Sequence, residues 1–174
     1  MTTLAPDVRQ LHEGLGIPDG YGSSGLPPQY AEAAELVDIG PNLVGRMQRL
    51  SPRASERWSA MVAAAREDDQ VLLIVSGFRS FEYQAALIRK KLEAGQAIGD
   101  ILAVNAAPGF SQHHTGEAVD IASPGSRPLT EEFDQSPAFD WLTRRAGEFG
   151  FVMTYPPNNK YGFVYEPWHW ALGA

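Results

Sequence analysis

The sequence of 174 residues contains no cysteine, which excludes disulfide bonds and any metal site built on thiolates. It has no apolar run of about 18 residues either, so we expect no membrane-spanning helix. The net charge is −7 and no basic patch stands out, which argues against nucleic acid as a partner. Any metal in this protein must therefore be held by histidine, aspartate or glutamate.

The composition is that of a small globular protein. With 44% hydrophobic residues the chain can bury a real core, and its length suggests one domain. We interpret residues 1–50 as an irregular entry segment packed on the core and residues 51–174 as the main domain. In the entry segment, Val8, Leu11 and Leu15 can line a short helix that stops near Gly16. Residues 31–50 give only a weak pattern, which we interpret as packing around the back of the core.

The rest of the chain alternates helix and strand signals. Ser51-Pro52 and Ser136-Pro137 are helix starts, because serine caps the first turn and proline suits the first helical position. Val71–Val75 is a continuous apolar run typical of a buried central strand. These patterns predict an α+β domain with a small, mostly antiparallel sheet and a cleft at the strand ends. Further helices are expected after Ser80 (with Ala86, Leu87 and Leu92 on the apolar face) and over Ile98–Val104, and further strands over Ala118–Ile121, Phe151–Thr154, Gly162–Tyr165 and Trp168–Ala171.

The stretch 111–120 carries the clearest chemical signal. The chain has only four histidines, and three of them, His113, His114 and His169, fall in this stretch and near the C-terminus. Imidazole and carboxylate together suit zinc. One of the paired histidines would be a ligand from a loop, Asp120 a ligand from the strand that follows, and His169 the third. Spacing alone does not decide between His113 and His114.

Three protein ligands leave one zinc position open for water, which is the catalytic pattern rather than the structural one. Such a metal acidifies the water and polarises a carbonyl, and a base must then move the proton. Glu166, three residues before His169, is the candidate base. The alternative from the residues alone is that Glu166 supports a ligand histidine by a hydrogen bond.

These residues resemble a known family. Ser111-x-His113-x-x-Gly116-x-Ala118-x-Asp120, followed by Glu166-x-Trp168-His169, is similar to the signature of the zinc D-alanyl-D-alanine carboxypeptidases of the VanY type, in peptidase family M15. The resemblance covers roughly the C-terminal two-thirds of the chain, from about Ser76 onward. The family shares its fold with the DD-dipeptidases, the L,D-carboxypeptidases and the hedgehog signalling domain. The resemblance therefore implies that fold here.

The resemblance assigns roles that spacing leaves open. It selects His113, Asp120 and His169 as the ligands of one zinc ion and Glu166 as the catalytic base. It also implies that Arg79, in Ser-Gly-Phe-Arg-Ser after the first strand of the domain, faces the substrate. There a guanidinium can bind a terminal carboxylate or a developing oxyanion. From the residues alone, a surface salt bridge is the alternative for Arg79.

Three more positions match substrate-facing ones, with a plainer alternative for two of them. Gln84 and Ser111 match polar positions of the family, and Ser111 could otherwise simply cap its loop. Trp168 can wall the substrate pocket, and core packing is its alternative. His114 is then a neighbouring polar group or a surface side chain. Gln112 stands where the family often has glutamate, a departure that we interpret as peripheral to the metal.

The resemblance implies a zinc metallopeptidase that removes the C-terminal D-alanine of peptidoglycan stem peptides or their precursors by metal-activated water. An L,D-carboxypeptidase or a peptidoglycan endopeptidase is the close alternative, because the same zinc and glutamate serve all three. A non-catalytic, zinc-containing cell-wall-binding domain is an alternative of another class, and the retained Glu166 and Arg79 argue against it. A serine hydrolase is disfavoured because no Gly-x-Ser-x-Gly motif is present.

The expected partner is the peptidoglycan stem peptide, and we expect a monomer. Residues 1–7 show no basic start followed by an apolar core, so no signal peptide is visible. The sequence alone therefore favours the cytoplasm. A peptidoglycan substrate would instead favour the periplasm or the cell envelope.

Overall fold

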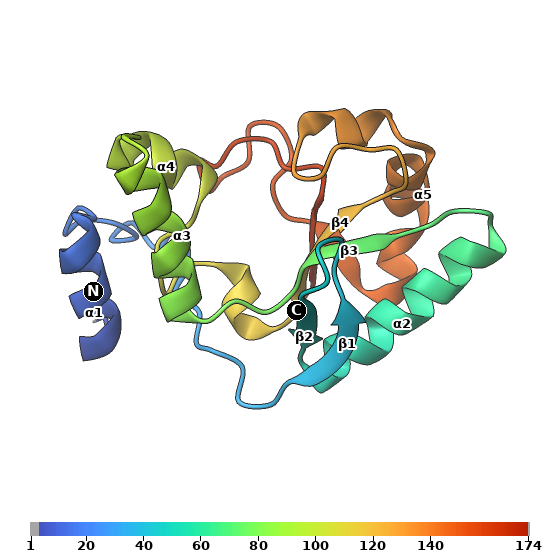
Figure 1. The fold of residues 1–174 in the computed structure, drawn as a ribbon, viewed down its shortest axis with the longest axis horizontal. Coiled ribbons are helices and arrows are strands. Elements are labelled where there is room, and N and C mark those ends of the chain that lie inside the picture. Colours follow the sequence, from blue (N-terminus) through green and yellow to red (C-terminus); the bar gives the residue numbers. More distant parts are fainter. Residues whose placement is uncertain (1–3, 174) are drawn as a thin grey trace.

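A computed structural model describes residues 4–173 and shows two small antiparallel sheets with helices on both sides (Figure 1). This arrangement confirms the predicted α+β fold class. In chain order the elements of this region are α1 (Pro6–Leu15), β1 (Val37–Pro41), β2 (Met47–Leu50), α2 (Pro52–Glu67), β3 (Leu73–Ser76), α3 (Phe81–Glu93), α4 (Ile98–Val104), β4 (Ala118–Ala122), α5 (Pro137–Arg145), β5 (Phe151–Met153) and β6 (His169–Leu172). Short 3-10 turns cover Gln112–Thr115, Glu131–Gln135 and Ala146–Phe149.

The main sheet has the strand order β3-β4-β6-β5 with all neighbours antiparallel. Every residue of β4 is buried, and its side chains alternate between the two faces of the sheet. Val119 and Ile121 belong to the larger core, together with Trp58 of α2 and Trp141 of α5. The opposite face carries Asp120. Burial on one face thus fixes which side of the sheet the carboxylate occupies.

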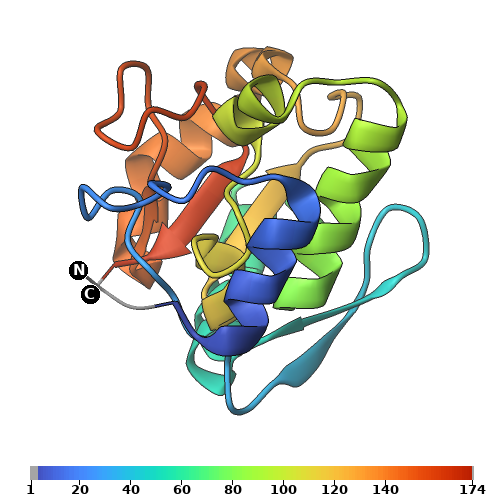
Figure 2. The same cartoon turned by 90° about the vertical axis from the view of Figure 1, so that its left-hand side faces the viewer.

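A second core joins the other helices. Leu15 at the end of α1 packs with Ala85 and Ile88 of α3 and with Ile101 of α4. Figure 1 places α1, α3 and α4 on one side of the main sheet and α2 and α5 on the other. Turned by 90°, Figure 2 shows α1 and α3 side by side in front of the strands. The site described below lies between this helical layer and the sheet.

Helix starts follow the serine caps that the sequence predicts. The side-chain oxygens of Ser51, Ser80 and Ser136 accept hydrogen bonds from the backbone amides of Ala54, Tyr83 and Phe139. Such a cap stabilises a helix by about 1 kcal/mol. The helix from Pro137 ends at Arg145 and continues as a 3-10 turn to Phe149, just before Gly150, which takes a left-handed conformation.

Two strand predictions are wrong. β3 lies at an edge of the sheet rather than at its centre, and Val71 is exposed. Side chains cover part of its outer edge, because Asn42 donates to the carbonyl of Val75 and Gln48 accepts from the amide of Gly77. Both side chains come from the β1–β2 hairpin region, which the weak pattern of residues 31–50 did not reveal.

Residues 162–165 form no strand. The amide of Val164 donates to the carbonyl of Ala103 in α4, and the carbonyl of Phe163 accepts from the side chain of Asn159. These bonds replace a strand ladder and hold the segment across the helical layer. The predicted apolar face of α3 is also wrong in part, since Ala86 is exposed while the polar Gln84 is buried. Within residues 4–173, no helix is long and apolar enough to span a membrane.

Candidate metal centre and active-site cleft

Three elements bring the predicted metal ligands together. His113 lies in the 3-10 turn before β4, Asp120 on β4 and His169 at the start of β6. Asp120 and His169 are directly opposite each other in the antiparallel register, so the sheet itself sets their separation. One ligand atom from each of the three residues lies within 4.8 Å of the others, and all three residues are buried.

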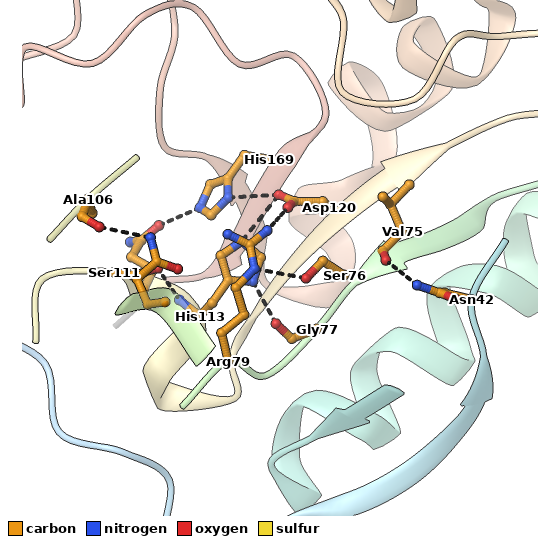
Figure 3. A network of polar contacts seen from close by, with 12 residues as sticks. Asn42, Val75, Ser76, Gly77, Arg79, Ala106, Ser111, His113, Asp120 and His169 are labelled. Carbon is orange, nitrogen blue, oxygen red and sulfur yellow. Dashed lines mark hydrogen bonds and ion pairs between the residues drawn. The ribbon is translucent and has the colours of Figure 1, made fainter. Parts of the chain in front are cut away.

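Hydrogen bonds fix which ring nitrogen of each histidine is free. His113 donates from Nδ1 to the carbonyl of Gly77 at 2.7 Å, and His169 donates from Nε2 to Oε1 of Gln112 at 2.8 Å. The remaining nitrogens, Nε2 of His113 and Nδ1 of His169, lie 3.2 and 3.1 Å from the same Oδ1 of Asp120. Figure 3 shows both rings turned toward this carboxylate.

This arrangement fits a metal cation. With both imidazoles neutral, two nitrogen lone pairs and a carboxylate oxygen face one another, and three acceptors repel unless a positive charge lies among them. A proton on His113 is disfavoured, because burial and the charge of Arg79 lower its pKa to about 4. Two imidazoles and one carboxylate are a donor set that zinc accepts. The described residues therefore provide three groups that could together hold a metal ion.

The second oxygen of Asp120 pairs with Arg79. The guanidinium binds Oδ2 through one terminal nitrogen and donates from Nε to the hydroxyl of Ser76 at 2.9 Å (Figure 3). Ser76 is itself opposite Asp120 in the β3–β4 pairing. Burial alone would raise the pKa of Asp120, but the charge of Arg79, whose guanidinium binds Oδ2, helps to hold it well below its ordinary value. Asp120 is therefore an anion at neutral pH.

Glu166 lines the same cavity as the three ligands. Its backbone amide donates to the carbonyl of Tyr155, and its carbonyl accepts from the amide of His169 in the turn that leads into β6. Burial, with a further contribution from the charge of Asp120, raises the pKa of Glu166 to about 8. A carboxyl group that titrates near neutrality can both accept and release a proton.

The cavity has a volume of about 320 Å³, at the small end of ligand pockets. All eight residues predicted to form the site line it: His113, Asp120, His169, Glu166, Arg79, Gln84, Ser111 and Trp168. Gln84 donates to the carbonyl of Ala106, while its buried Oε1 has no partner among the described residues. That oxygen can accept a hydrogen bond from a ligand. The hydroxyl of Ser111 also caps its own turn by accepting from the amide of His113.

The neighbouring histidine His114 has a structural role. It is fully buried, so the predicted alternative of a surface side chain is wrong. Its Nδ1 donates to the carbonyl of Arg79 at 2.7 Å, and its Nε2 accepts from the amide of Gly109 at 3.1 Å. His114 therefore links the loop that carries His113 to the segment that carries Arg79 by hydrogen bonds.

Sequence reasoning missed two contacts of His169. Gln112, predicted to be peripheral, is its hydrogen-bond partner and fixes the free nitrogen. The ring of Tyr155 lies 4.7 Å from that of His169, centroid to centroid, and also lines the cavity. The departure from glutamate at position 112 was the available signal for the first contact. Tyr155 lies outside both motifs, so no pattern indicated it.

The amino-acid sequence is similar to those of known carboxypeptidases. The family model described as VanY, D-alanyl-D-alanine carboxypeptidase, matches residues 47–172. Among curated proteins, YodJ of Bacillus subtilis is 30% identical over 157 residues, and a D-alanyl-D-alanine carboxypeptidase of Enterococcus faecalis is 29% identical over 155. The matches cover 83% of this chain but only 55% and 53% of those proteins. The chain thus spans about half the length of the curated relatives it matches.

Solved structures with similar folds include two kinds of peptidase. The LdcB LD-carboxypeptidase has a TM-score of 0.73 at 27% identity, with 83% of this chain and 71% of that one covered. VanYB in complex with D-alanine-D-alanine has a TM-score of 0.63 at 28% identity, with 85% and 81% covered. A VanY D,D-pentapeptidase mutant in complex with Zn(II) gives 0.62 at 28% identity, with 84% and 82% covered.

Proposed function

The chain belongs to the VanY family of D-alanyl-D-alanine carboxypeptidases, and we propose that it is a zinc enzyme that removes the C-terminal D-alanine of peptidoglycan stem peptides. The observation that carries this proposal is the convergence of three acceptors, on His113, Asp120 and His169, in one cavity with Glu166. A metallopeptidase needs a Lewis acid and a proton carrier side by side, and this cavity offers both positions.

Zinc bound at the three ligands would polarise the scissile carbonyl and acidify water. Glu166 then accepts the proton of the attacking water and returns it to the leaving amine. Its pKa of about 8 makes it a ready proton donor, and a cation at the ligands would oppose that shift because positive charge favours the carboxylate. Both effects together bring Glu166 into the range where it can act in both directions.

The other residues of the cavity would bind and orient the substrate. Arg79 is held at the metal end by Asp120 and Ser76, which suits stabilisation of the oxyanion that develops on the scissile carbonyl. The free Oε1 of Gln84 can accept from a peptide amide of the substrate. Trp168, half-buried at the cavity wall, excludes water from one side.

An L,D-carboxypeptidase activity is the second candidate. It is supported by the LdcB LD-carboxypeptidase, whose TM-score of 0.73 exceeds the 0.63 of the VanYB complex at similar identity. The two activities differ in the configuration of the residue before the terminal D-alanine. The ligands, the base and Arg79 serve both reactions, so substrate preference depends on the walls of the cavity.

The deciding experiment uses defined peptides. The zinc-loaded protein is incubated with a stem pentapeptide that ends in D-Ala-D-Ala and with the tetrapeptide that lacks the last residue, and the products are weighed by mass spectrometry. Loss of one alanine from the pentapeptide supports the D,D activity, and loss from the tetrapeptide supports the L,D activity. Glu166→Gln is the control. No release from either peptide, or equal release by the control, would refute the proposal.

A further inference from the structure

The cavity contains a second cation besides Arg79. Lys91, on α3, lines it together with Asn105 at the end of α4. The ammonium of Lys91 donates to Oδ1 of Asn105 at 2.5 Å. Among residues 4–173, no carboxylate lies within ion-pair distance of Lys91. An ammonium has three donors, so a neutral amide positions this group without neutralising its charge.

The lack of a carboxylate partner matters because Lys91 is partly removed from solvent. Lys91 is half-buried, whereas Lys90, the next residue on the same helix, is exposed to solvent. Burial lowers the pKa of Lys91, the charge of Glu166 opposes this change and that of Arg79 adds to it, so the ammonium lies within electrostatic reach of both groups. A partly desolvated cation in a cavity gains more from an anionic partner than a surface lysine does.

The position of Lys91 suits the end of a bound peptide. Gln84 and Lys91 lie seven residues apart on the cavity face of α3, about 10 Å along the helix axis. A helical side chain leans toward the N-terminus of its own helix, which brings the ammonium back toward Gln84. A peptide whose amide contacts Gln84 and whose chain then follows this face of α3 has its terminal group on the side of Lys91.

Arg79 is less suited to bind that terminal group. Its guanidinium already pairs with Asp120 and with Ser76 at the metal end of the cavity. Release from Asp120 would break an ion pair with a buried carboxylate, which is unfavourable. The sequence suggested Arg79 for either the terminal carboxylate or the oxyanion, and the contacts favour the oxyanion.

We propose that Lys91, oriented by Asn105, binds the free C-terminal carboxylate of the substrate and thereby restricts the enzyme to the ends of peptides. This inference rests on the proposed function, because only an exopeptidase needs a group that recognises a terminal carboxylate. Leu129 and Val164 also line the cavity, and their apolar side chains form a border beside the ion pair.

The test compares a stem peptide with a free C-terminal carboxylate and the same peptide with a C-terminal amide. For the native enzyme, kcat/KM should be higher for the acid. Lys91→Met should lose about 10- to 100-fold on the acid, mainly through KM, and little on the amide, because a hydrogen bond to a charged group is lost only with the acid. Lys91→Arg should retain part of the preference. Lys90→Met is the matched control and should behave as the native enzyme does.

Two outcomes would overturn the inference. Equal losses on acid and amide for Lys91→Met would mean that Lys91 supports Glu166 or the fold instead of the carboxylate. A native enzyme indifferent to amidation would show that the cavity does not recognise the terminus, while its turnover would still support hydrolysis as the proposed function.

A binding measurement keeps the inference testable if no peptide is cleaved, which would count against the proposed function alone. Calorimetry with zinc-loaded Glu166→Gln protein compares the dissociation constants of the acid and the amide, with and without Lys91→Met. A preference for the acid that Lys91→Met abolishes supports the inference. No preference, or one that Lys91→Met leaves unchanged, refutes it.

Discussion

Replacing His114 tests whether the loop that carries the metal ligands is anchored as the structure shows. In His114→Leu, the buried amide of Gly109 and the partly buried carbonyl of Arg79 lose their hydrogen-bond partner. Each unsatisfied buried group costs about 1–3 kcal/mol, so the variant should lose about 2–6 kcal/mol of unfolding free energy. Leucine has a similar volume, which keeps the change in packing against Phe81 small.

The assay is urea denaturation of metal-free protein, followed by tryptophan fluorescence at pH 7.5. His12→Leu is a graded control, because the buried His12 bonds one carbonyl, that of Pro108, at 2.8 Å. His12→Leu should lose about half as much unfolding free energy as His114→Leu. The slope of unfolding free energy against urea concentration should be the same in both variants. His114→Gln, which keeps a donor and an acceptor, should fall between the native protein and His114→Leu. A loss in His114→Leu no larger than in His12→Leu would refute the anchoring role.

The same variant has a pH signature. Burial lowers the pKa of His114 to about 4, below the value of 6.5 expected for the unfolded chain. The folded state therefore holds His114 neutral, and its contribution to stability is complete above pH 6.5 and lost as the pH falls toward 4. A difference of about 2.5 pKa units corresponds to about 3 kcal/mol. Between pH 7 and 4, His114→Leu should lose less unfolding free energy than the native protein, by roughly that amount. Identical pH profiles would contradict this reasoning.

Three shorter predictions concern the metal centre. The native protein should bind one zinc per chain by elemental analysis, and stoichiometric zinc in His113→Ala or His169→Ala would rule out the ligand assignment. Glu166→Ala should keep its zinc and lose about 10²-fold or more in turnover of stem peptide, the usual size of an acid–base effect, and near-normal turnover would assign the proton transfer to another group. Gln112→Leu should weaken zinc affinity about 10- to 100-fold in a chelator competition, because the amide fixes the free nitrogen of His169. Unchanged affinity would mean that this nitrogen is fixed in another way.

Local signals in the sequence predicted most of the helices. A Ser-Pro pair indicates both the cap and the first residue of a helix, so the helix starts at Pro52 and Pro137 can be predicted from neighbouring residues alone. The position of β3 at the sheet edge could not be predicted in this way, because strand order depends on contacts between distant segments. The hairpin of β1 and β2 was missed for a related reason. β1 is largely exposed and lacks the alternation of a half-buried strand.

The candidate metal ligands could be identified from the sequence because they lie in two compact motifs. His113 and Asp120 frame one motif and His169 ends the other, and the structure brings all three together. Lys91 and Tyr155 lie outside the motifs, and whether a lysine on a helix faces a cavity or solvent depends on what packs beside it. Lys90 and Lys91 are adjacent and chemically identical, and only the fold distinguishes them. For this reason the sequence predicts the reacting centre better than the walls that select a substrate.

The bonds from Gly77 and Arg79 to the two adjacent histidines have a consequence for metal exchange. The carbonyl of Gly77 accepts a hydrogen bond from His113, and the carbonyl of Arg79 accepts one from His114, so one short backbone segment orients the loop. A side chain at position 77 would collide with the carbonyl of Arg49, with only 2.6 Å available to a Cβ atom, which keeps this backbone close against the hairpin. The ligands are thus preorganised, and little conformational entropy is lost when a cation arrives. We therefore expect the architecture of the site to persist when a chelator removes the proposed zinc ion.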